Sequence, residues 1–211
     1  MLNKNNSLEK QLYILTAIIV LFFACNSKTD RSRSTSRLPE PDLVQRLEYQ
    51  KAAIDTLYDH SKEKIIVFAK LADNDELVPI TNEDFPENVE TSFSILKDSS
   101  GKLITTSEIP VSQSGDWYIV LTHYFDKNGQ TFAFERQTNF FNGICTGGVA
   151  YETKTEFYDD NFELVSSQYK LVDAKNQPLN KDSCGHAYNF DYKVSSNADH
   201  YLHAKKIKKD R

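Results

Sequence analysis

Cys184 and His186 are the residues of this sequence whose types and spacing come closest to a catalytic pair. On an extended chain, side chains two positions apart point to the same side, so the thiol and the imidazole can meet. A catalytic cysteine needs a neighbouring base of this kind and surroundings that favour the thiolate. This pair therefore defines one hypothesis, an envelope hydrolase that uses Cys184 as its nucleophile. Oxidation of Cys184 to a disulfide would remove that nucleophile.

A second candidate site is the glycine-rich segment 138–149, with the sequence TNFFNGICTGGV. It holds three of the seven glycines and two adjacent phenylalanines, namely Gly143, Gly147, Gly148, Phe140 and Phe141. Glycine lets the backbone approach a ligand or adopt positive φ, and the phenylalanines would supply an apolar rim. The alternative, which we favour, is a tight connection between two strands that a disulfide at Cys145 holds in place. The Gly-Lys-Ser/Thr ending of a phosphate-binding loop is absent.

The histidines and the acidic turns do not match a known metal site. His200 and His203 would share one side of a helix, but a zinc ion takes three or four ligands. His123 or His186 would have to complete the set from elsewhere in the fold. Acidic turns recur at residues 73–76, 82–84 and 159–161. None of them fits the calcium loop of an EF-hand, so we expect neither a metal nor a cofactor.

A helix is expected to begin at Asp42 and to pack on the rest of the domain. Asp42 can cap the first free N–H groups, and Gln45 stands where a capping box has Glu or Gln. Apolar residues then fall on one stripe at helical spacing: Leu43, Leu47, Ile54, Leu57 and Tyr58. The polar residues, which include Lys51 and Asp55, are predicted to face away. We expect the stripe to pack on a sheet, and a partner-binding helix is the alternative.

From residue 64 onward the pattern becomes that of strands separated by turns. Apolar or alternating segments occur at 65–69, 90–96, 102–106, 116–125, 151–158, 162–172 and 188–194, and another strand returns after 126–129. Turns begin at Asp98, Asp126, Asp159 and Asp173 without a fixed repeat, which excludes solenoids and propellers. The predicted fold is α+β, an N-terminal helix packed on a curved antiparallel meander of about eight strands. The alternative is a β-sandwich with a peripheral helix.

The first 25 residues determine where this domain is expected to reside. Lys4 and Lys10 precede thirteen mostly apolar residues, and Ala24 stands directly before Cys25. A charged start, an apolar segment and a small residue at the boundary are typical of a secretory signal. At about 1.5 Å per residue the segment is about 20 Å long, too short for a bilayer core of about 30 Å.

The end of this segment, Phe22-Phe-Ala-Cys25, resembles the lipobox of bacterial lipoproteins. The resemblance implies that the signal is removed before Cys25 and that the Cys25 thiol is acylated. The next residues are polar and cannot bury enough surface to fold, so they are interpreted as a flexible tether. The predicted organisation is a signal peptide at 1–24, a lipidated Cys and tether at 25–41, a single β-rich domain at 42–204 and a basic tail at 205–211.

Charge and cysteine content agree with this location. Loss of the leader changes the formal charge at pH 7 from −5 to −6, whereas a nucleic-acid partner demands clustered positive charge. If Cys25 carries lipid, Cys145 and Cys184 remain as an even number in an oxidising compartment. We therefore expect a Cys145–Cys184 disulfide, with two unpaired thiols as the alternative. The basic tail is expected to be solvated, the alternative being contact with anionic lipid.

The sequence thus predicts a membrane-anchored cell-envelope lipoprotein whose β-rich domain binds a partner. The anchor would lie in the cell membrane or the outer membrane, with the domain in the periplasm or at the cell surface. The many aromatic residues and the incomplete catalytic sets favour a protein, peptide or glycan partner over a substrate. The alternative is the hydrolase that uses the glycine-rich segment and the Cys184/His186 pair.

Overall fold

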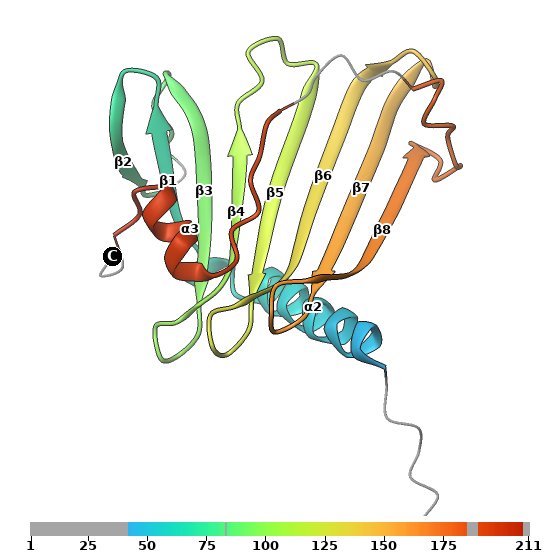
Figure 1. The fold of residues 1–211 in the computed structure, drawn as a ribbon. Coiled ribbons are helices and arrows are strands. Elements are labelled where there is room, and N and C mark those ends of the chain that lie inside the picture. Colours follow the sequence, from blue (N-terminus) through green and yellow to red (C-terminus); the bar gives the residue numbers. More distant parts are fainter. Residues whose placement is uncertain (1–41, 83, 185–189, 209–211) are drawn as a thin grey trace, which may run out of the picture. The chain divides into compact units, whose positions relative to one another are not determined.

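Eight antiparallel strands form one continuous sheet, with helix α2 on one face and the C-terminal segment on the other (Figure 1). The computed structural model describes residues 42–82, 84–184 and 190–208. The strands lie in the order β2-β1-β3-β4-β5-β6-β7-β8. They comprise β1 Ile66–Leu71, β2 Asn74–Ile80, β3 Val89–Lys97, β4 Leu103–Pro110, β5 Trp117–Phe125, β6 Thr131–Gly143, β7 Gly148–Tyr158 and β8 Leu164–Asp173. The helices are α2 Leu43–His60 and α3 Ala198–Ala204, with a short 3-10 turn η1 at Lys62–Lys64.

This arrangement confirms the predicted α+β fold, an N-terminal helix on an antiparallel meander of eight strands. Every neighbouring pair in the sheet is antiparallel, and from β3 onward each strand lies beside its successor. The β-sandwich alternative is wrong, because a sandwich needs two packed sheets and these strands belong to one.

Four hairpin turns use the same aspartate geometry, which explains why they were recognisable in the sequence. The Oδ1 atoms of Asp98, Asp126, Asp159 and Asp173 each accept backbone N–H bonds from the residues two and four positions later, at 2.8–3.0 Å. The residue three positions later has positive φ in every case: Gly101, Gly129, Phe162 and Asn176. Such Asx turns fix the chain reversal locally, so each hairpin is specified by a few adjacent residues.

Two segments differ from the predicted strands. Residues 74–80 form β2, although 73–76 was predicted as an acidic turn; the turn occupies only 72–73. Charged residues fit there because β2 is an edge strand that pairs only with β1. Conversely, the described part of predicted strand 188–194 pairs with no strand of the described sheet. Phe190, Tyr192 and Val194 still pack on the sheet. The alternating pattern therefore belongs to an extended segment with one buried side that is not a strand of the sheet.

Helix α2 begins where the sequence predicted. The Asp42 carboxylate accepts a hydrogen bond from the Gln45 N–H at 2.8 Å, which caps the helix. Leu47 is the buried residue of the helix, and with Ile54 it packs on apolar residues of the sheet. Leu57, predicted on the same stripe, is largely exposed. The apolar contact of the helix with the sheet therefore comes from a short patch, Leu47 and Ile54.

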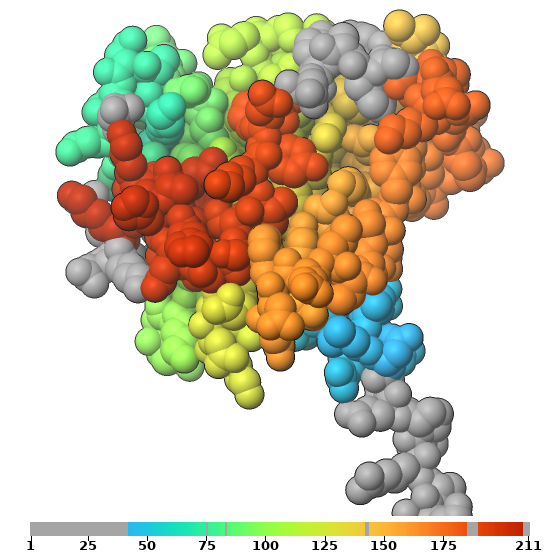
Figure 2. Space-filling model, in the orientation of Figure 1, coloured from blue at the N-terminus to red at the C-terminus, as the bar shows by residue number. Residues whose placement is uncertain are grey.

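The two faces of the sheet differ in what covers them. We call the side that carries α2 the helix face and the other side the C-terminal face. On β5, Tyr118, Val120, Thr122 and Tyr124 point to the helix face, whereas Ile119, Leu121, His123 and Phe125 point to the C-terminal face. Residues 190–208, including α3, cover the strands β1–β5 on the C-terminal face, as the space-filling view of that side shows (Figure 2).

Part of the predicted basic tail belongs to this covering layer. Ile207 is buried in the same apolar cluster as Tyr201 and Leu202 of α3. The Lys205 Nζ lies 2.7 Å from a carboxylate oxygen of Glu108 on β4. Lys205 and Ile207 are thus packed rather than solvated, because an apolar side chain within the basic run reaches the core. Residues 209–211 lie outside the described part of the chain.

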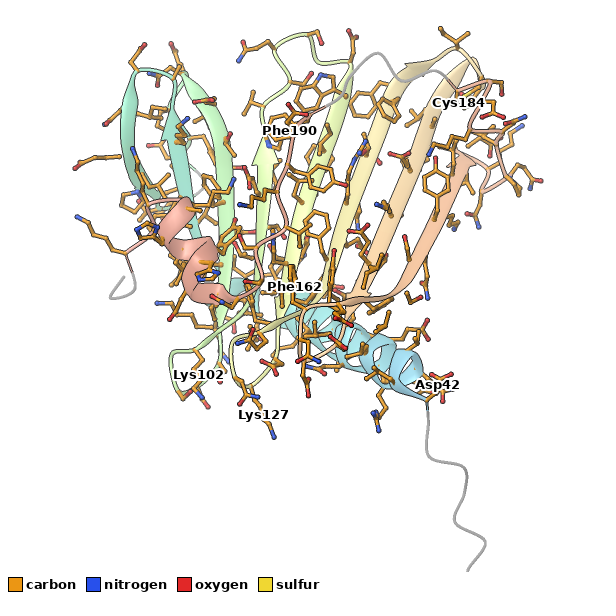
Figure 3. All side chains as sticks on the ribbon, in the orientation of Figure 1. Asp42, Lys102, Lys127, Phe162, Cys184 and Phe190 are labelled. Atoms are coloured by element: carbon orange, nitrogen blue, oxygen red, sulfur yellow. A yellow bond between two sulfur atoms is a disulfide. The ribbon has the colours of Figure 1, made fainter. Side chains whose placement is uncertain are left out.

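A disulfide joins Cys145 to Cys184, as the sequence predicted, with a Cα–Cα distance of 4.9 Å. It links the turn between β6 and β7 to the segment that follows β8 (Figure 3). Figure 3 also shows that Cys184 lies at the end of the sheet opposite Lys102 and Lys127, which occupy the β3–β4 and β5–β6 turns. For the closed loop of 39 residues, the chain-entropy contribution is about 4 kcal/mol.

Candidate functional site

The disulfide removes the predicted thiol nucleophile. The Cys184 sulfur is bonded to Cys145, and Cys184 is buried against Phe140, Ala150 and Leu171. A nucleophilic cysteine needs a free thiolate that a substrate can reach, and neither condition is met here. His186, the predicted base, lies outside the described residues. The Cys184/His186 hydrolase hypothesis is therefore not pursued further.

The glycine-rich segment is a tight, disulfide-linked hairpin, as favoured from the sequence. Strand β6 runs to Gly143 and β7 begins at Gly148, so only the residues from Ile144 to Gly147 form the turn. Phe140 is buried in the cluster around the disulfide, whereas Phe141 is partly exposed. The segment does not line any of the three cavities described below.

His123 and His200 lie in structural positions. His123 is buried, and its Nε2 accepts a hydrogen bond from the Ser195 N–H at 3.1 Å. Burial, followed by the nearby charge of Lys205, lowers the pKa of His123 to about 3. The His200 ring contacts Ser196 and Asn197, beside the N-terminus of α3. In residues 42–82, 84–184 and 190–208, no three His, Cys, Asp or Glu side chains are grouped closely enough to hold a metal ion.

A polar cleft between α2 and the helix face of β4–β6 is the candidate site. Its volume is about 430 Å³, within the range of about 300–1,000 Å³ that is typical of small-molecule sites. The second half of α2 forms one wall, and three strands form the other. The lining residues are Ile54, Asp55, Tyr58, Asp59, Thr105, Ser107, Ile109, Tyr118, Val120, Thr122, Tyr124, Glu135 and Gln137.

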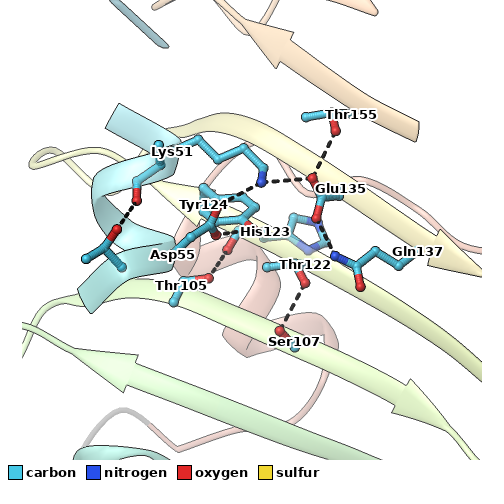
Figure 4. Close-up of polar contacts among 12 residues, drawn as sticks. Lys51, Asp55, Thr105, Ser107, Thr122, His123, Tyr124, Glu135, Gln137 and Thr155 are labelled. Carbon is cyan, nitrogen blue, oxygen red and sulfur yellow. Dashed lines mark hydrogen bonds and ion pairs between the residues drawn. The ribbon is translucent and has the colours of Figure 1, made fainter. Parts of the chain in front are cut away.

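One end of the cleft is closed by an ion-pair network between helix and sheet (Figure 4). The Lys51 Nζ lies 2.9 Å from an Asp55 oxygen and 2.8 Å from Glu135 Oε2. The Tyr124 hydroxyl donates to Asp55 at 2.8 Å, and the Lys51 ammonium lies 4.8 Å from the centre of the Tyr124 ring. The prediction that Lys51 and Asp55 face away is wrong, because Glu135 and Tyr124 give them partners on the sheet.

The network sets the charge of its members. Burial alone would lower the pKa of Lys51, but the hydrogen bonds and negative charges of Glu135 and Asp55 outweigh it and raise the pKa. Burial, then the charges of Glu135 and Asp55, raises the pKa of the Tyr124 hydroxyl far above its ordinary value. Lys51 is thus held as an ammonium and Tyr124 as a neutral donor. Thr155 and Gln137 complete the shell by donating to the Glu135 carboxylate at 2.9 and 2.7 Å.

The middle of the cleft is lined by hydroxyl groups. Ser107 and Thr122 bond to each other across β4 and β5 at 3.0 Å, and Tyr58 donates to Ser94 at 2.9 Å. Tyr118, which also lines the cleft, is 41% exposed although its strand is central in the sheet. Partial burial and the adjacent Tyr58 raise the pKa of the Tyr118 hydroxyl. The Tyr118 hydroxyl therefore stays neutral, and the side chains of Tyr58 and Tyr118 both line the cleft.

The charge of the lining restricts what the cleft can hold. Three carboxylates line it, those of Asp55, Asp59 and Glu135, and no Lys or Arg does. Lys51 neutralises part of this charge from behind the wall. An anion would meet uncompensated repulsion here, whereas hydroxyl and ammonium groups would find acceptors. The cleft can thus bind a neutral polar ligand or a cation.

Two further cavities lie on the C-terminal face. One, of about 330 Å³, is lined by both apolar and charged residues, and the apolar ones include Ile95, Leu103 and Leu202. The other, of about 320 Å³, lies beside the Lys205–Glu108 ion pair. Their walls belong to the packing of the C-terminal segment, so we assign the candidate site to the helix face.

No pattern in the sequence pointed directly to this site. Tyr118, Thr122 and Tyr124 lie in the segment 116–125, which the sequence predicts only as a strand. A usable signal was the run of hydroxyl residues Thr105, Ser107 and Thr122 at positions that alternate toward one face. An apolar interface with a helix would have Val, Ile or Leu at those positions.

The fold and the site together describe a helix packed on an open antiparallel sheet with a polar cleft between the two layers. Comparisons with protein-family models, with curated proteins and with solved structures found no match. In the described residues, no helix is long and apolar enough to cross a membrane. The leader and Cys25 precede the described part of the chain.

Proposed function

We propose that this protein is a lipid-anchored envelope protein whose domain binds a small polar ligand in the cleft between α2 and β4–β6. The cleft is the observation that carries the proposal. Its volume suits a small molecule, and its walls present hydroxyl and carboxylate groups that a packed interface would not contain. A binding function requires such a cleft but does not require a set of catalytic residues.

The anchor part of the proposal is supported by the sequence. The lipobox-like ending Phe22–Cys25 and the polar residues after it suit a domain that is tethered to a membrane surface. The Cys145–Cys184 disulfide suits an oxidising compartment such as the periplasm or the cell surface. The proposed location is therefore the cell membrane or the outer membrane.

The anchor is tested by the intact mass of the full-length protein recovered from its native membrane fraction. We expect a chain that begins at Cys25 and is heavier by its acyl chains. It should gain about two mass units on reduction of the one disulfide. An unprocessed chain without lipid would contradict the anchor while leaving the cleft untouched.

Ligand binding is tested by mass spectrometry of small molecules that co-purify with the full-length protein from envelope extract. The Val120→Trp variant should lose the bound compound because the indole fills the cleft, and Tyr118→Ala should bind it more weakly. The matched control is Val165→Trp, at an exposed position of β8 outside the cleft. Retention of the same compound by Val120→Trp, with a native circular dichroism spectrum, would contradict the proposal. So would the absence of any specific compound.

A further inference from the structure

One ammonium group, that of Lys51, already lies beside the cleft and contacts two of the carboxylates that line it. The ammonium has a carboxylate oxygen on either side, from Asp55 and Glu135, and the ring of Tyr124 at 4.8 Å. Carboxylates and aromatic faces are the two groups that bind organic cations most strongly in proteins. Asp59, Tyr58 and Tyr118 add the same two kinds of group, a carboxylate and aromatic rings, to the lining of the cleft.

From this repetition we infer that the ligand of the cleft is a small aliphatic diamine or polyamine. Its ammonium groups would bind the carboxylates of Asp55 and Asp59 and its carbon chain would lie against Tyr58 and Tyr118. This inference rests on the proposed binding function and names the chemical class of the ligand.

Asp55 is paired with Lys51, but Asp59 adds a second carboxylate near the end of α2. Asp55 and Asp59 are four residues apart on the same side of the helix, where like charges repel by about 0.2–0.5 kcal/mol. Asp59 lies in the last turn of α2, where the negative end of the helix dipole disfavours a carboxylate. The cations that follow, Lys62 and Lys64, are exposed and do not line the cleft. A bound ammonium would relieve both conflicts.

The spacing of the carboxylates suits two linked ammonium groups. Residues i and i+4 of a helix have Cβ atoms about 5–6 Å apart, and an extended four-carbon diamine separates its nitrogens by about 6 Å. Glu135 lies further into the cleft on β6 and already bonds Lys51. A chain that bridges Asp55 and Asp59 would thus run along the wall of the cleft past the two tyrosine rings.

The lining also explains which ligands would be rejected. An anion finds no Lys or Arg among the lining residues. A neutral polyol would leave the negative charge of the Asp59 end uncompensated. The affinity of the cleft should therefore depend first on the charge of the ligand and second on its chain length. The hydroxyl groups of the cleft distinguish ligands less, because they can hydrogen-bond to many polar molecules.

The test is calorimetric titration of the full-length protein in detergent with spermidine, putrescine and the neutral analogue 1,4-butanediol. We expect spermidine to bind with an affinity that falls as ionic strength rises, and 1,4-butanediol to bind at least about tenfold more weakly. Asp59→Asn should weaken spermidine binding about tenfold through loss of one charge-assisted hydrogen bond. The matched control Asp73→Asn removes the same charge from the β1–β2 turn and should change affinity less than about twofold.

A lysine side chain carries one ammonium group, whereas a diamine carries two. Binding of Nα-acetyl-lysine methylamide as tightly as spermidine would overturn the diamine assignment. Binding of a neutral disaccharide such as cellobiose, lost in Val120→Trp, without binding of spermidine would overturn the inference but leave the proposed function standing. If no probe binds and no compound co-purifies, the proposed function fails as well.

Discussion

Along β5, the side chains that point to the C-terminal face and those that point to the helix face meet different surroundings. Ile119, Leu121 and Phe125 on the first side are 0%, 2% and 1% exposed. On the second side, Tyr118 is 41% exposed, and Thr122 is buried with its hydroxyl bonded to Ser107. One strand thus contributes to an apolar core on one side and to a polar cleft on the other.

The shorter of the two helices that cover the sheet buries more of its side chains than the longer one. The short helix α3 has seven residues, of which Ala198, Tyr201 and Leu202 are buried. The longer α2 has eighteen residues and buries only Leu47. Because buried apolar area supplies most of the stability of a fold, the C-terminal face should hold the domain together. The helix face is then free to carry polar groups for binding.

The strongest test of this division compares two tyrosines. Tyr201 is fully buried against His123 and Phe125, so Tyr201→Ala should lower the free energy of unfolding by about 4 kcal/mol. Tyr118→Ala, on the helix face, should change it by less than about 0.5 kcal/mol. Urea denaturation of both variants measures the difference. Equal losses would show that the two faces contribute equally to stability.

A second test uses acid. His123 on the C-terminal face has a pKa of about 3, whereas a histidine in the unfolded chain has a pKa of about 6.5. Between these values the unfolded chain binds a proton that the folded chain does not, so stability falls as pH decreases. From pH 6.5 to pH 4 the expected loss is about 3 kcal/mol.

The control for this test is His123→Phe, which keeps an aromatic ring among Phe125, Phe134 and Tyr201. Carboxylates also titrate in this range, so the readout is the difference in pH dependence between the two proteins. The variant should lose about 3 kcal/mol less than the parent over the same interval. Parallel curves for the two proteins would mean that His123 is protonated in the folded state.

On the helix face, the ion-pair network is the feature whose loss should matter most. Lys51→Met leaves the Glu135 carboxylate, 7% exposed, without its cation. Breaking a buried pair typically costs about 3–5 kcal/mol; we expect about 2 kcal/mol because the cleft admits water to Asp55. The double variant Lys51→Met/Glu135→Gln should recover most of the loss in thermal denaturation. No recovery would indicate that the lysine stabilises the domain by packing alone.

The sequence specified the parts of this fold that depend on adjacent residues. The Asp42 cap and the aspartate turns at Asp98, Asp126, Asp159 and Asp173 each need only a few neighbours in the chain, and all were identified. Strand β2 was missed because Asn74–Glu76 has the composition of a turn. Its place at the sheet edge, which tolerates such residues, follows only from the pairing of distant strands.

The site was missed for a related reason. Lys51 and Asp55 have the polarity of a solvated helix side, and only Glu135 and Tyr124 make them part of an interface. Asp55 and Tyr124 are 69 residues apart in the sequence, so no local pattern joins them. The disulfide was predictable because cysteine count and compartment restrict its partners, whereas a hydroxyl or carboxylate has many partners available.

The smallest expected effect compares the caps of the two helices. Asp42 caps α2 and Asn197 caps α3, each by accepting a backbone N–H at 2.8 Å. Asp42→Ala and Asn197→Ala should each cost about 1 kcal/mol locally. Because α2 has little buried apolar contact, Asp42→Ala should speed amide hydrogen exchange throughout α2 while the sheet stays protected. In Asn197→Ala, the buried Tyr201 and Leu202 should keep the exchange of α3 tied to unfolding of the sheet. Faster exchange confined to α3 would show that the C-terminal face is not the more firmly held side.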